Sequence, residues 1–244
     1  MVSGLYTARD GMMILQEMVD NTTNNLANAN TSGFKKSLAV SMARVQNNYN
    51  DQSQLSHDES HWMVENRIDW TPGSMVQTGN PMDVALEGDG FLTVETPNGD
   101  VRYTRAGSLT RNGMGELVTL AGDKVLDQSG GPILTDGSSF QVSTSGEIST
   151  GGDRVANLKI VDFADRSLLQ REGGNLYSAP EEADAQLAEN VQVRQGFVES
   201  SNVNAVEGMV ELIRFQRNYE MDQKAARSED ETLQKAVNDI GRVS

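Results

Sequence analysis

The sequence predicts an α+β protein with a helix at each end of the chain and an antiparallel β-rich region between them. Residues 5–29 and 209–240 each carry mainly apolar side chains at positions spaced alternately by three and four, which is typical of a helical packing face. The stretch between them breaks into short apolar runs separated by glycine-containing turns, which is typical of antiparallel strands. We therefore expect the terminal helices to pair as a coiled-coil-like bundle and the middle of the chain to form a central β domain.

The N-terminal helix is predicted from an apolar seam in which only Thr22 is polar. Thr31-Ser32-Gly33 marks its end, because glycine readily adopts the left-handed conformation that closes a helix. An amphipathic helix lying on a globular core would show the same periodicity. The seam positions are Leu5, Ala8, Met12, Leu15, Val19, Thr22, Leu26 and Ala29.

Asparagine is unusually frequent at the end of this helix, where five of the ten residues from 21 to 30 are Asn. Asparagine is a mediocre helix former, because its side chain competes for backbone hydrogen bonds. A carboxamide also both donates and accepts hydrogen bonds. We therefore expect Asn21, Asn25 and Asn28 to bond to neighbouring helices and to fix their register.

The C-terminal helix is predicted to begin near Asn204, because Asn204-Ala205-Val206-Glu207 has the form of a capping box. Its three polar seam residues share one heptad slot, which indicates a wetter neighbour on that side. The seam positions are Met209, Leu212, Gln216, Tyr219, Gln223, Ala226, Asp230, Leu233, Val237 and Ile240.

Between the helices, residues 37–74 are expected to be an extended connector with a short helix near 38–48, and residues 75–199 a central β domain. Residues 1–36 and 200–244 would form the paired helical domain. Asn98-Gly99 is a strong hairpin signal. Aromatic residues are few, so we expect a core of mostly Val, Leu and Ile. The predicted strands are Met82–Leu86, Phe91–Glu95, Val101–Arg105, Glu116–Leu120, Lys124–Leu126, Phe140–Ser143 and Leu158–Phe163.

Composition excludes several classes of function. The net charge of −15 lies almost entirely between the two helices, whose own charges nearly balance. A phosphate backbone needs a basic partner, so nucleic-acid binding is not expected. The chain has no cysteine, which excludes disulfides and thiolate chemistry. No apolar run is long enough for membrane insertion, and the N-terminus does not have the pattern of a cleavable signal peptide. We expect a cytoplasmic protein or one exported by a route without such a signal.

Candidates for chemistry are weak, and we expect no enzyme activity, cofactor or metal. His57 and His61 share a spacing that can bind zinc on a helix, but the segment is polar and lacks the Glu of the metalloprotease motif. The acidic run 181–184 lacks the spaced oxygens of a calcium loop. The 88–90 turn lacks the lysine and glycine spacing of a phosphate loop.

Three long motifs resemble the bacterial flagellar basal-body rod and hook protein family. They are residues 23–35 (TNNLANANTSGFK), the segments 83–91 and 103–109 in the middle, and residues 196–204 (GFVESSNVN). The motifs occur in the family's order and span nearly the whole chain. The motif residues at the two ends that carry the resemblance are Asn24, Asn25, Leu26, Ala27, Asn28, Thr31, Gly33, Phe34, Gly196, Glu199, Ser201, Asn202 and Val203.

The resemblance implies a tubular structure in which paired terminal helices form an inner tube and a β domain lies outside it. It also implies partners: copies of this chain, other rod subunits, and the flagellar type III export apparatus. Only 50 positions separate Gly33 from Asp83, which resembles proximal more than distal rod members. The expected assembly interface is Leu5, Met12, Leu15, Val19, Asn21, Asn25, Leu26, Asn28, Met209, Leu212, Tyr219, Leu233, Val237 and Ile240.

A second class of function stays open from the residues alone. The β domain could recognise a ligand while the helices serve only to oligomerise the chain. Such a binding module would form a compact closed dimer. An assembly subunit would instead have terminal helices that become ordered only in the assembled state, because an unpaired helix leaves its apolar face in water.

Overall fold

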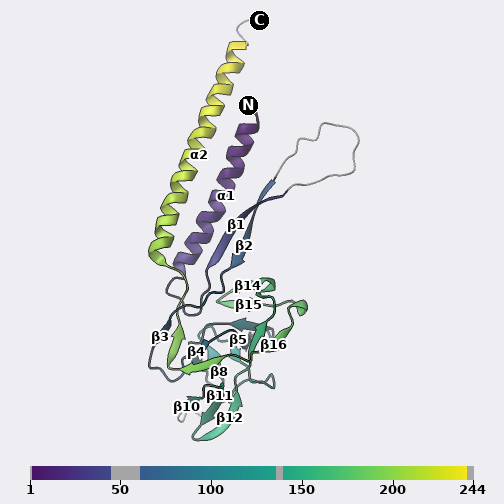
Figure 1. Cartoon of the computed structure of the whole chain (residues 1–244), viewed down its shortest axis with the longest axis vertical. Helices are drawn as coiled ribbons and strands as arrows, with labels where there is room; N and C mark the ends of the chain where they lie inside the picture. The colour runs from purple at the N-terminus through teal and green to yellow at the C-terminus, as the bar shows by residue number, and fades with distance from the viewer. Residues whose placement is uncertain (1, 45–60, 136–139, 241–244) are drawn as a thin grey trace, which may run out of the picture. The chain divides into compact units, whose positions relative to one another are not determined.

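The computed structural model describes residues 2–44, 61–135 and 140–240, and it divides the chain into two compact units (Figure 1). The first, here called the helical unit, consists of residues 1–27, 36–69 and 203–244. The second, here called the β unit, consists of residues 28–35 and 70–202. The chain therefore passes between the units four times, and each unit is assembled from segments that are distant in sequence.

The helical unit contains the two terminal helices, α1 (Val2–Ala27) and α2 (Ala205–Ile240), which lie side by side (Figure 1). It also contains an antiparallel pair of strands, β1 (Ser37–Arg44) and β2 (His61–Ile68). The short helix expected near 38–48 is therefore wrong for its described part. Apolar residues alternate with small or polar ones along β1, and this period of two matches a strand and not a helix.

The capping prediction for α2 is confirmed. The backbone N–H groups of Val206 and Glu207 donate to Asn204 Oδ1 at 3.1 and 3.3 Å, which satisfies two of the donors left free at a helix start. The other helix, α1, stops at Ala27, two residues before the last expected seam position.

The β unit confirms the predicted antiparallel β-rich region, since every strand pair described in it is antiparallel. Its main sheet has nine strands, seven of them in the order β14-β15-β6-β5-β9-β8-β7, with β13 beside β5 and β16 beside β13. β5 (Phe91–Glu95) has the predicted bounds. Gly99 adopts a φ of +89° in the turn to β6, as the Asn-Gly hairpin signal predicts.

The nine-stranded sheet is accompanied by smaller sheets, which pair β10, β11 and β12, β17 with β4, and β18 with β3. The remaining elements of the β unit are β3 (Met75–Gln77), β4 (Val84–Glu87), β6 (Val101–Thr104), β7 (Leu109–Arg111), β8 (Leu117–Thr119), β9 (Lys124–Val125), β10 (Phe140–Val142), β11 (Glu147–Thr150), β12 (Asp153–Asn157), β13 (Ile160–Phe163), η1 (Arg166–Leu168), β14 (Gln170–Gly173), β15 (Leu176–Ser178), η2 (Glu181–Ala183), β16 (Ala185–Leu187), β17 (Gln192–Gln195) and β18 (Phe197–Glu199).

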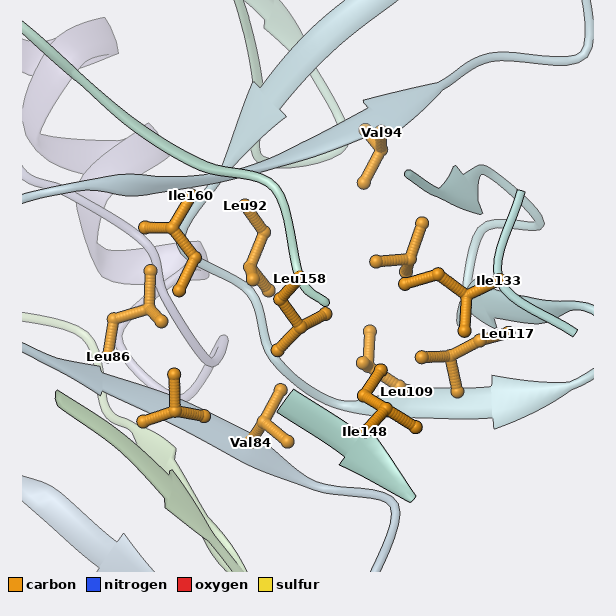
Figure 2. Close-up of a cluster of buried hydrophobic side chains, with 12 residues drawn as sticks. Val84, Leu86, Leu92, Val94, Leu109, Leu117, Ile133, Ile148, Leu158 and Ile160 are labelled. Atoms are coloured by element: carbon orange, nitrogen blue, oxygen red, sulfur yellow. The ribbon is translucent and has the colours of Figure 1, made fainter. Parts of the chain in front are cut away.

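The core of the β unit consists of Val, Leu and Ile side chains, as expected, and Figure 2 shows them converging from several strands. The β unit also contains an aromatic cluster around Trp70. The centre of the Trp70 ring lies 5.3 Å from that of Phe91 and 5.0 Å from that of Tyr177, both in edge-on geometry. The core residues are Val84, Leu86, Leu92, Val94, Leu109, Leu117, Val125, Ile133, Ile148, Leu158, Ile160 and Val193.

Within the described residues, no helix has the length and apolar character needed to cross a membrane.

Candidate functional site: a buried ion cluster and an unpaired helix face

One residue from each of the three sequence motifs meets the others in a buried ion cluster of the β unit. Lys35 Nζ lies 2.5 Å from Glu199 Oε1, and Arg105 Nη1 lies 3.6 Å from Glu199 Oε2. All three side chains are at most 3% exposed. Charges so deeply buried require both ionic and hydrogen-bonding partners to offset their desolvation.

Neighbouring backbone groups supply part of that compensation around Lys35 and Glu199. Lys35 Nζ donates to the Thr71 carbonyl oxygen at 3.0 Å. The Gly73 backbone N–H donates to Glu199 Oε1 at 2.9 Å. The loop 71–73, which follows the return of the chain to the β unit, is thereby attached to the first and last motifs at once.

Arg105 is held by carbonyl oxygens of the second motif as well as by Glu199. Its Nη1 and Nη2 donate to the Leu86 and Gly88 carbonyl oxygens at 3.3 and 2.8 Å. Its guanidinium also lies 5.4 Å from the centre of the Phe91 ring. Burial lowers the pKa of Arg105 below its ordinary value, and the Glu199 carboxylate opposes that shift.

A second group of polar contacts holds residues 28–35 along the β unit. Arg171 Nη2 donates to the Lys35 carbonyl oxygen, and its guanidinium lies 4.3 Å from the centre of the Phe34 ring. Asn175 Nδ2 donates to the Ser32 carbonyl oxygen at 2.9 Å. Residues 28–35 of the first motif therefore belong to the β unit, whereas residues 23–27 belong to the helical unit, in which the sequence predicts the whole motif.

Gly33 explains why the first motif carries a glycine at this point. Its φ is +72°, and its backbone N–H donates to the Glu199 carbonyl oxygen at 2.8 Å. A Cβ atom at this position would lie 2.5 Å from the Ala106 backbone nitrogen. Only glycine fits both the conformation and the close approach of the second motif.

The cluster has the chemistry of a structural lock. Its charged groups are paired with one another and with backbone groups, and the two cations share one carboxylate, while Arg105 Nε and Glu199 Oε2 make no hydrogen bond within the described part of the chain. Removing one partner from a buried ion pair typically costs about 3–5 kcal/mol, because it leaves an uncompensated charge. No group of three or more His, Asp or Glu in the described ranges is arranged to hold a metal ion. His57 lies outside the described residues, as does the side chain of His61.

The predicted seam of α1 lies on its less exposed side. Met12, Leu15, Val19 and Leu26 are all half-buried, while Met13, between seam positions, is 65% exposed. The side chain of Leu5 is outside the described residues.

Along α2, the two heptad slots of the expected seam differ in burial, and within the slot of Met209 and Gln216 only Gln223 is half-buried among the described residues. Leu212 and Tyr219 are half-buried as expected, but Met209 is 51% exposed and Gln216 is exposed. Phe215, which the predicted seam omits, is half-buried in its place. The face that α2 covers therefore follows Leu212, Phe215 and Tyr219. The side chains of Leu233, Val237 and Ile240 lie outside the described residues.

On the opposite side of α2, an apolar stripe faces away from the covered residues. At about 100° per residue, these positions lie about 120–180° around the helix from Phe215 and about 60–180° from Leu212, with Met209 the nearest to Leu212. Val206 is 72% exposed and Ile213 is 51% exposed, so the stripe is uncovered in the single chain. The stripe, here called the outer stripe, consists of Val206, Met209, Val210, Ile213 and Met221.

Two asparagines of the predicted stripe bond to the β1–β2 hairpin of their own chain. Asn25 is buried and exchanges two hydrogen bonds with the Ser37 backbone, at 2.7 and 2.8 Å. Asn21 Nδ2 donates to Asn66 Oδ1 at 2.9 Å. Asn28, in the β unit, accepts from Thr31 Oγ1 at 3.2 Å. The register that these side chains fix inside the chain is that of α1 against the hairpin.

The sequence identifies Glu199 only as a motif residue and does not predict the roles of Lys35, Arg105 and Arg171. The available signal was a single charged residue in each of the ranges 23–35, 103–109 and 196–204: Lys35 after a run of polar and apolar residues, Arg105 before Ala-Gly, and Glu199 after Gly-Phe-Val. Isolated charges of this kind are frequently surface residues, and no spacing rule joins positions so far apart.

Comparison with known protein families matches three parts of the chain. Residues 5–35 match the family described as flagella basal body rod protein. Residues 85–150 match the flagellar hook protein FlgE/F/G D1 domain. Residues 194–239 match the flagellar basal body rod FlgEFG protein C-terminal family. Lys35, Arg105 and Glu199 fall one in each matched region.

Individual relatives match over essentially their full length. The flagellar basal-body rod protein FlgF of Caulobacter vibrioides is 34% identical over all of both chains. FlgF of Rhizobium meliloti is 30% identical over 99% of both. The flagellar basal-body rod protein FlgG of Bacillus subtilis is 31% identical over 98% of this chain and 99% of its own. These relatives are structural proteins, and this chain is not an enzyme. It belongs to the flagellar basal-body rod protein family.

Proposed function

We propose that many copies of this chain, or a few copies among related rod subunits, assemble helically around the flagellar export channel and transmit torque from motor to hook. The outer stripe is the observation that carries the proposal. Large apolar side chains in a row on one helix face rarely stay exposed in a finished assembly. Contacts that do not close into a ring generate open helical polymers.

In this proposal α1 and α2 pair as a coiled-coil-like bundle that forms the inner tube. The seam residues Met12, Leu15 and Val19 would face α2, and the outer stripe would pack on neighbouring subunits. Met209, which the sequence already placed in the interface, is exposed in the single chain. Val206, Val210 and Ile213 are exposed beside it, and we add them to the interface. Leu5, Leu233, Val237 and Ile240 would extend it toward the ends of the helices.

The proximal position, occupied by FlgF-like subunits, is the finer assignment that we favour over a distal, FlgG-like one. Identity alone separates the two weakly, at 34% for one FlgF and 31% for one FlgG. The lengths of the two alignments support the choice. The alignment with FlgF of Caulobacter vibrioides spans 249 residues, whereas the alignment with FlgG of Bacillus subtilis spans 268. A longer segment between the first and second motifs, which the family resemblance attributes to distal rod proteins, would lengthen an alignment in this way.

The proposed route is export through the flagellar type III apparatus without a cleavable signal peptide, followed by incorporation into the periplasm-spanning rod. A chain that travels unfolded gains from the absence of cysteine, because no disulfide can form before assembly.

Val210→Asp in the outer stripe tests the assembly proposal in the bacterium that carries this chain. We expect loss of swimming in soft agar and basal bodies without a complete rod, because a charge would be buried at every subunit contact. The purified variant should melt as the wild type does, within about 0.5 kcal/mol, since Val210 is 62% exposed in the single chain.

Leu120→Asp is the matched control, because it places the same charge at an apolar position that is 78% exposed in the β unit, away from the outer stripe. It should swim normally. Normal swimming and complete rods in Val210→Asp would contradict the proposal. A compact dimer of purified wild type that stays closed at high dilution would favour the ligand-binding module instead. Electron cryo-microscopy of the isolated basal bodies would decide between the proximal and distal positions.

A further inference from the structure

Three of the four points at which the chain passes between its units lie at or beside residues bonded to the buried ion cluster, and the remaining one leads into residues 28–35, which end at Lys35. Residues 28–35 enter the β unit after α1 and leave it at Lys35 itself. The chain returns at Trp70, one residue before Thr71, and leaves for the last time at Asn202, three residues after Glu199. Lys35, Thr71 and Glu199 are directly bonded through Lys35.

The last passage is attached to the same place. Asn202 Nδ2 donates to the Thr71 carbonyl oxygen at 3.0 Å and lies 3.2 Å from Thr71 Oγ1. The Thr71 carbonyl therefore accepts from Lys35 and from Asn202 together. Residues that flank three of the four passages are thus connected through the charged side chains of Lys35 and Glu199 and the Thr71 carbonyl group.

Glycines let the backbones of this region approach unusually closely. A Cβ on Gly73 would lie 1.8 Å from the Ser200 carbonyl oxygen, and one on Gly107 would lie 1.6 Å from the Val84 carbonyl oxygen. Any side chain at either position would force the segments apart. Segments packed backbone to backbone with buried charges between them have few ways to slide separately.

We propose that this junction, defined as residues 28–35, 70–73, Arg105 and 199–202, is a mechanical clamp. It holds the chain at three of the four passages, and residues 28–35 after the first one, in one body, so that force from the helical unit loads these segments together and does not peel away one segment at a time. This inference rests on the proposed function, because a rod subunit must carry torque between its parts.

Lys35 is the residue whose removal tests the clamp most cleanly. Arg105 stays beside Glu199 when Lys35 is replaced by Met, so a balanced pair of charges remains in the β unit. Loss of Glu199 would instead leave two buried cations without their carboxylate. We therefore expect Lys35→Met to fold and to lose the tie between the first motif, Thr71 and Glu199.

Single-molecule pulling measures the clamp directly in the purified full-length chain. The chain has no cysteine, so Thr23→Cys on α1 and Glu182→Cys on the β unit give two unique handles. In the wild type, the β unit should unfold as a whole without an earlier short step. In Lys35→Met, residues 28–35 should detach first, at lower force, with an added extension of roughly 28 Å at about 3.5 Å per residue.

Lys124→Met is the matched control, because it removes a Lys–Glu pair of the same unit at 3.0 Å that is partly exposed and distant from the junction in sequence. It should pull like the wild type. The clamp is refuted if Lys35→Met gives wild-type traces, or if the wild type itself releases a short segment first.

Hydrogen exchange of the wild type provides a test that needs no variant. The Gly33 and Gly73 amides donate to Glu199, and a closed clamp should protect them as strongly as the core amide of Leu126, which donates to Thr93. In Lys35→Met, exchange at Gly33 should become roughly 100-fold faster or more. Gly33 and Gly73 exchanging far faster than Leu126 in the wild type would overturn the proposal. Both tests use the purified, unassembled chain. Their failure would therefore leave the proposal of rod assembly, which is tested through Val210, unaffected.

Discussion

The two units of this chain differ in how far a single molecule completes them. In the β unit, Leu92, Val94 and Leu117 are at most 1% exposed, and even its deepest charges have ionic partners. Along α1 and α2, the fully buried side chains among the described residues are Thr22 and Asn25, both polar. The β unit therefore encloses a core of its own, while the helical unit leaves the outer stripe exposed in the single chain.

The largest loss in free energy of unfolding should come from truncating a side chain in the core of the β unit. Leu92→Ala should destabilise the β unit by about 2–5 kcal/mol, because it removes a fully buried side chain and leaves a cavity. Leu212→Ala, at a half-buried position of α2, should cost the single chain clearly less. Denaturant unfolding measures both free energies.

The two tryptophans separate the units in this measurement. Trp70 lies in the β unit and Trp62 in β2 of the helical unit. A Trp62→Phe background lets fluorescence follow the β unit, and a Trp70→Phe background lets it follow the helical unit. Equal losses in free energy of unfolding for Leu92→Ala and Leu212→Ala would contradict this difference between the units, because the helix pair would then be as well packed as the β core.

An intermediate effect is expected where the helical unit is closed, at Asn25. Asn25→Ala removes both hydrogen bonds to the Ser37 backbone, and a buried backbone group left unpaired costs about 1–3 kcal/mol. The loss should appear in the Trp62 signal. Asn24→Ala, at an exposed neighbouring position, should change it by less than about 0.5 kcal/mol. If neither variant shifts the single chain, the asparagines act only between subunits.

The same contrast explains which parts of the structure the sequence could predict. Phe91–Glu95 and the Asn98-Gly99 turn are local signals, and the structure follows them closely. On α2 the pattern was ambiguous, because apolar residues occupy both its covered and its outer face. Met209 fits a seam with Leu212 as well as Phe215 does, and only the position of α1 decides between them.

The ion cluster could not be predicted for a different reason. Lys35 and Glu199 are 164 residues apart, and the β unit brings them together only when its first and last segments meet. Periodicity and turn chemistry report on neighbours within one element, so they carry no information about such a pair. For the same reason, the sequence predicts Lys35 in the helical domain and Glu199 in the β domain, and it gives no sign that the two residues meet.

The smallest effect should be an acid-dependent one at the surface of the β unit. Arg166 Nη1 donates to Asp89 Oδ1 at 2.9 Å, and this bond holds the pKa of Asp89 below its ordinary value of 3.8. A carboxylate with a lowered pKa in the folded state stabilises the protein above that ordinary value. Its contribution is lost as the pH falls through the folded pKa. Asp89→Asn should therefore lose less than about 1 kcal/mol at neutral pH, because the pair is largely exposed, and should flatten the acid dependence below pH 4.

The denaturant midpoint of the β unit, followed across that pH range, measures the effect of Asp89→Asn. Arg166 keeps Asp162 as a partner in the variant, at 2.8 Å, which is a further reason for a small loss. Asp153→Asn, another exposed carboxylate of the same unit, controls for the change in net charge. A loss at Asp89 as large as that of Leu92→Ala would mean that surface charges hold the β unit closed. The contrast between the two units would then rest on electrostatics and no longer on apolar burial.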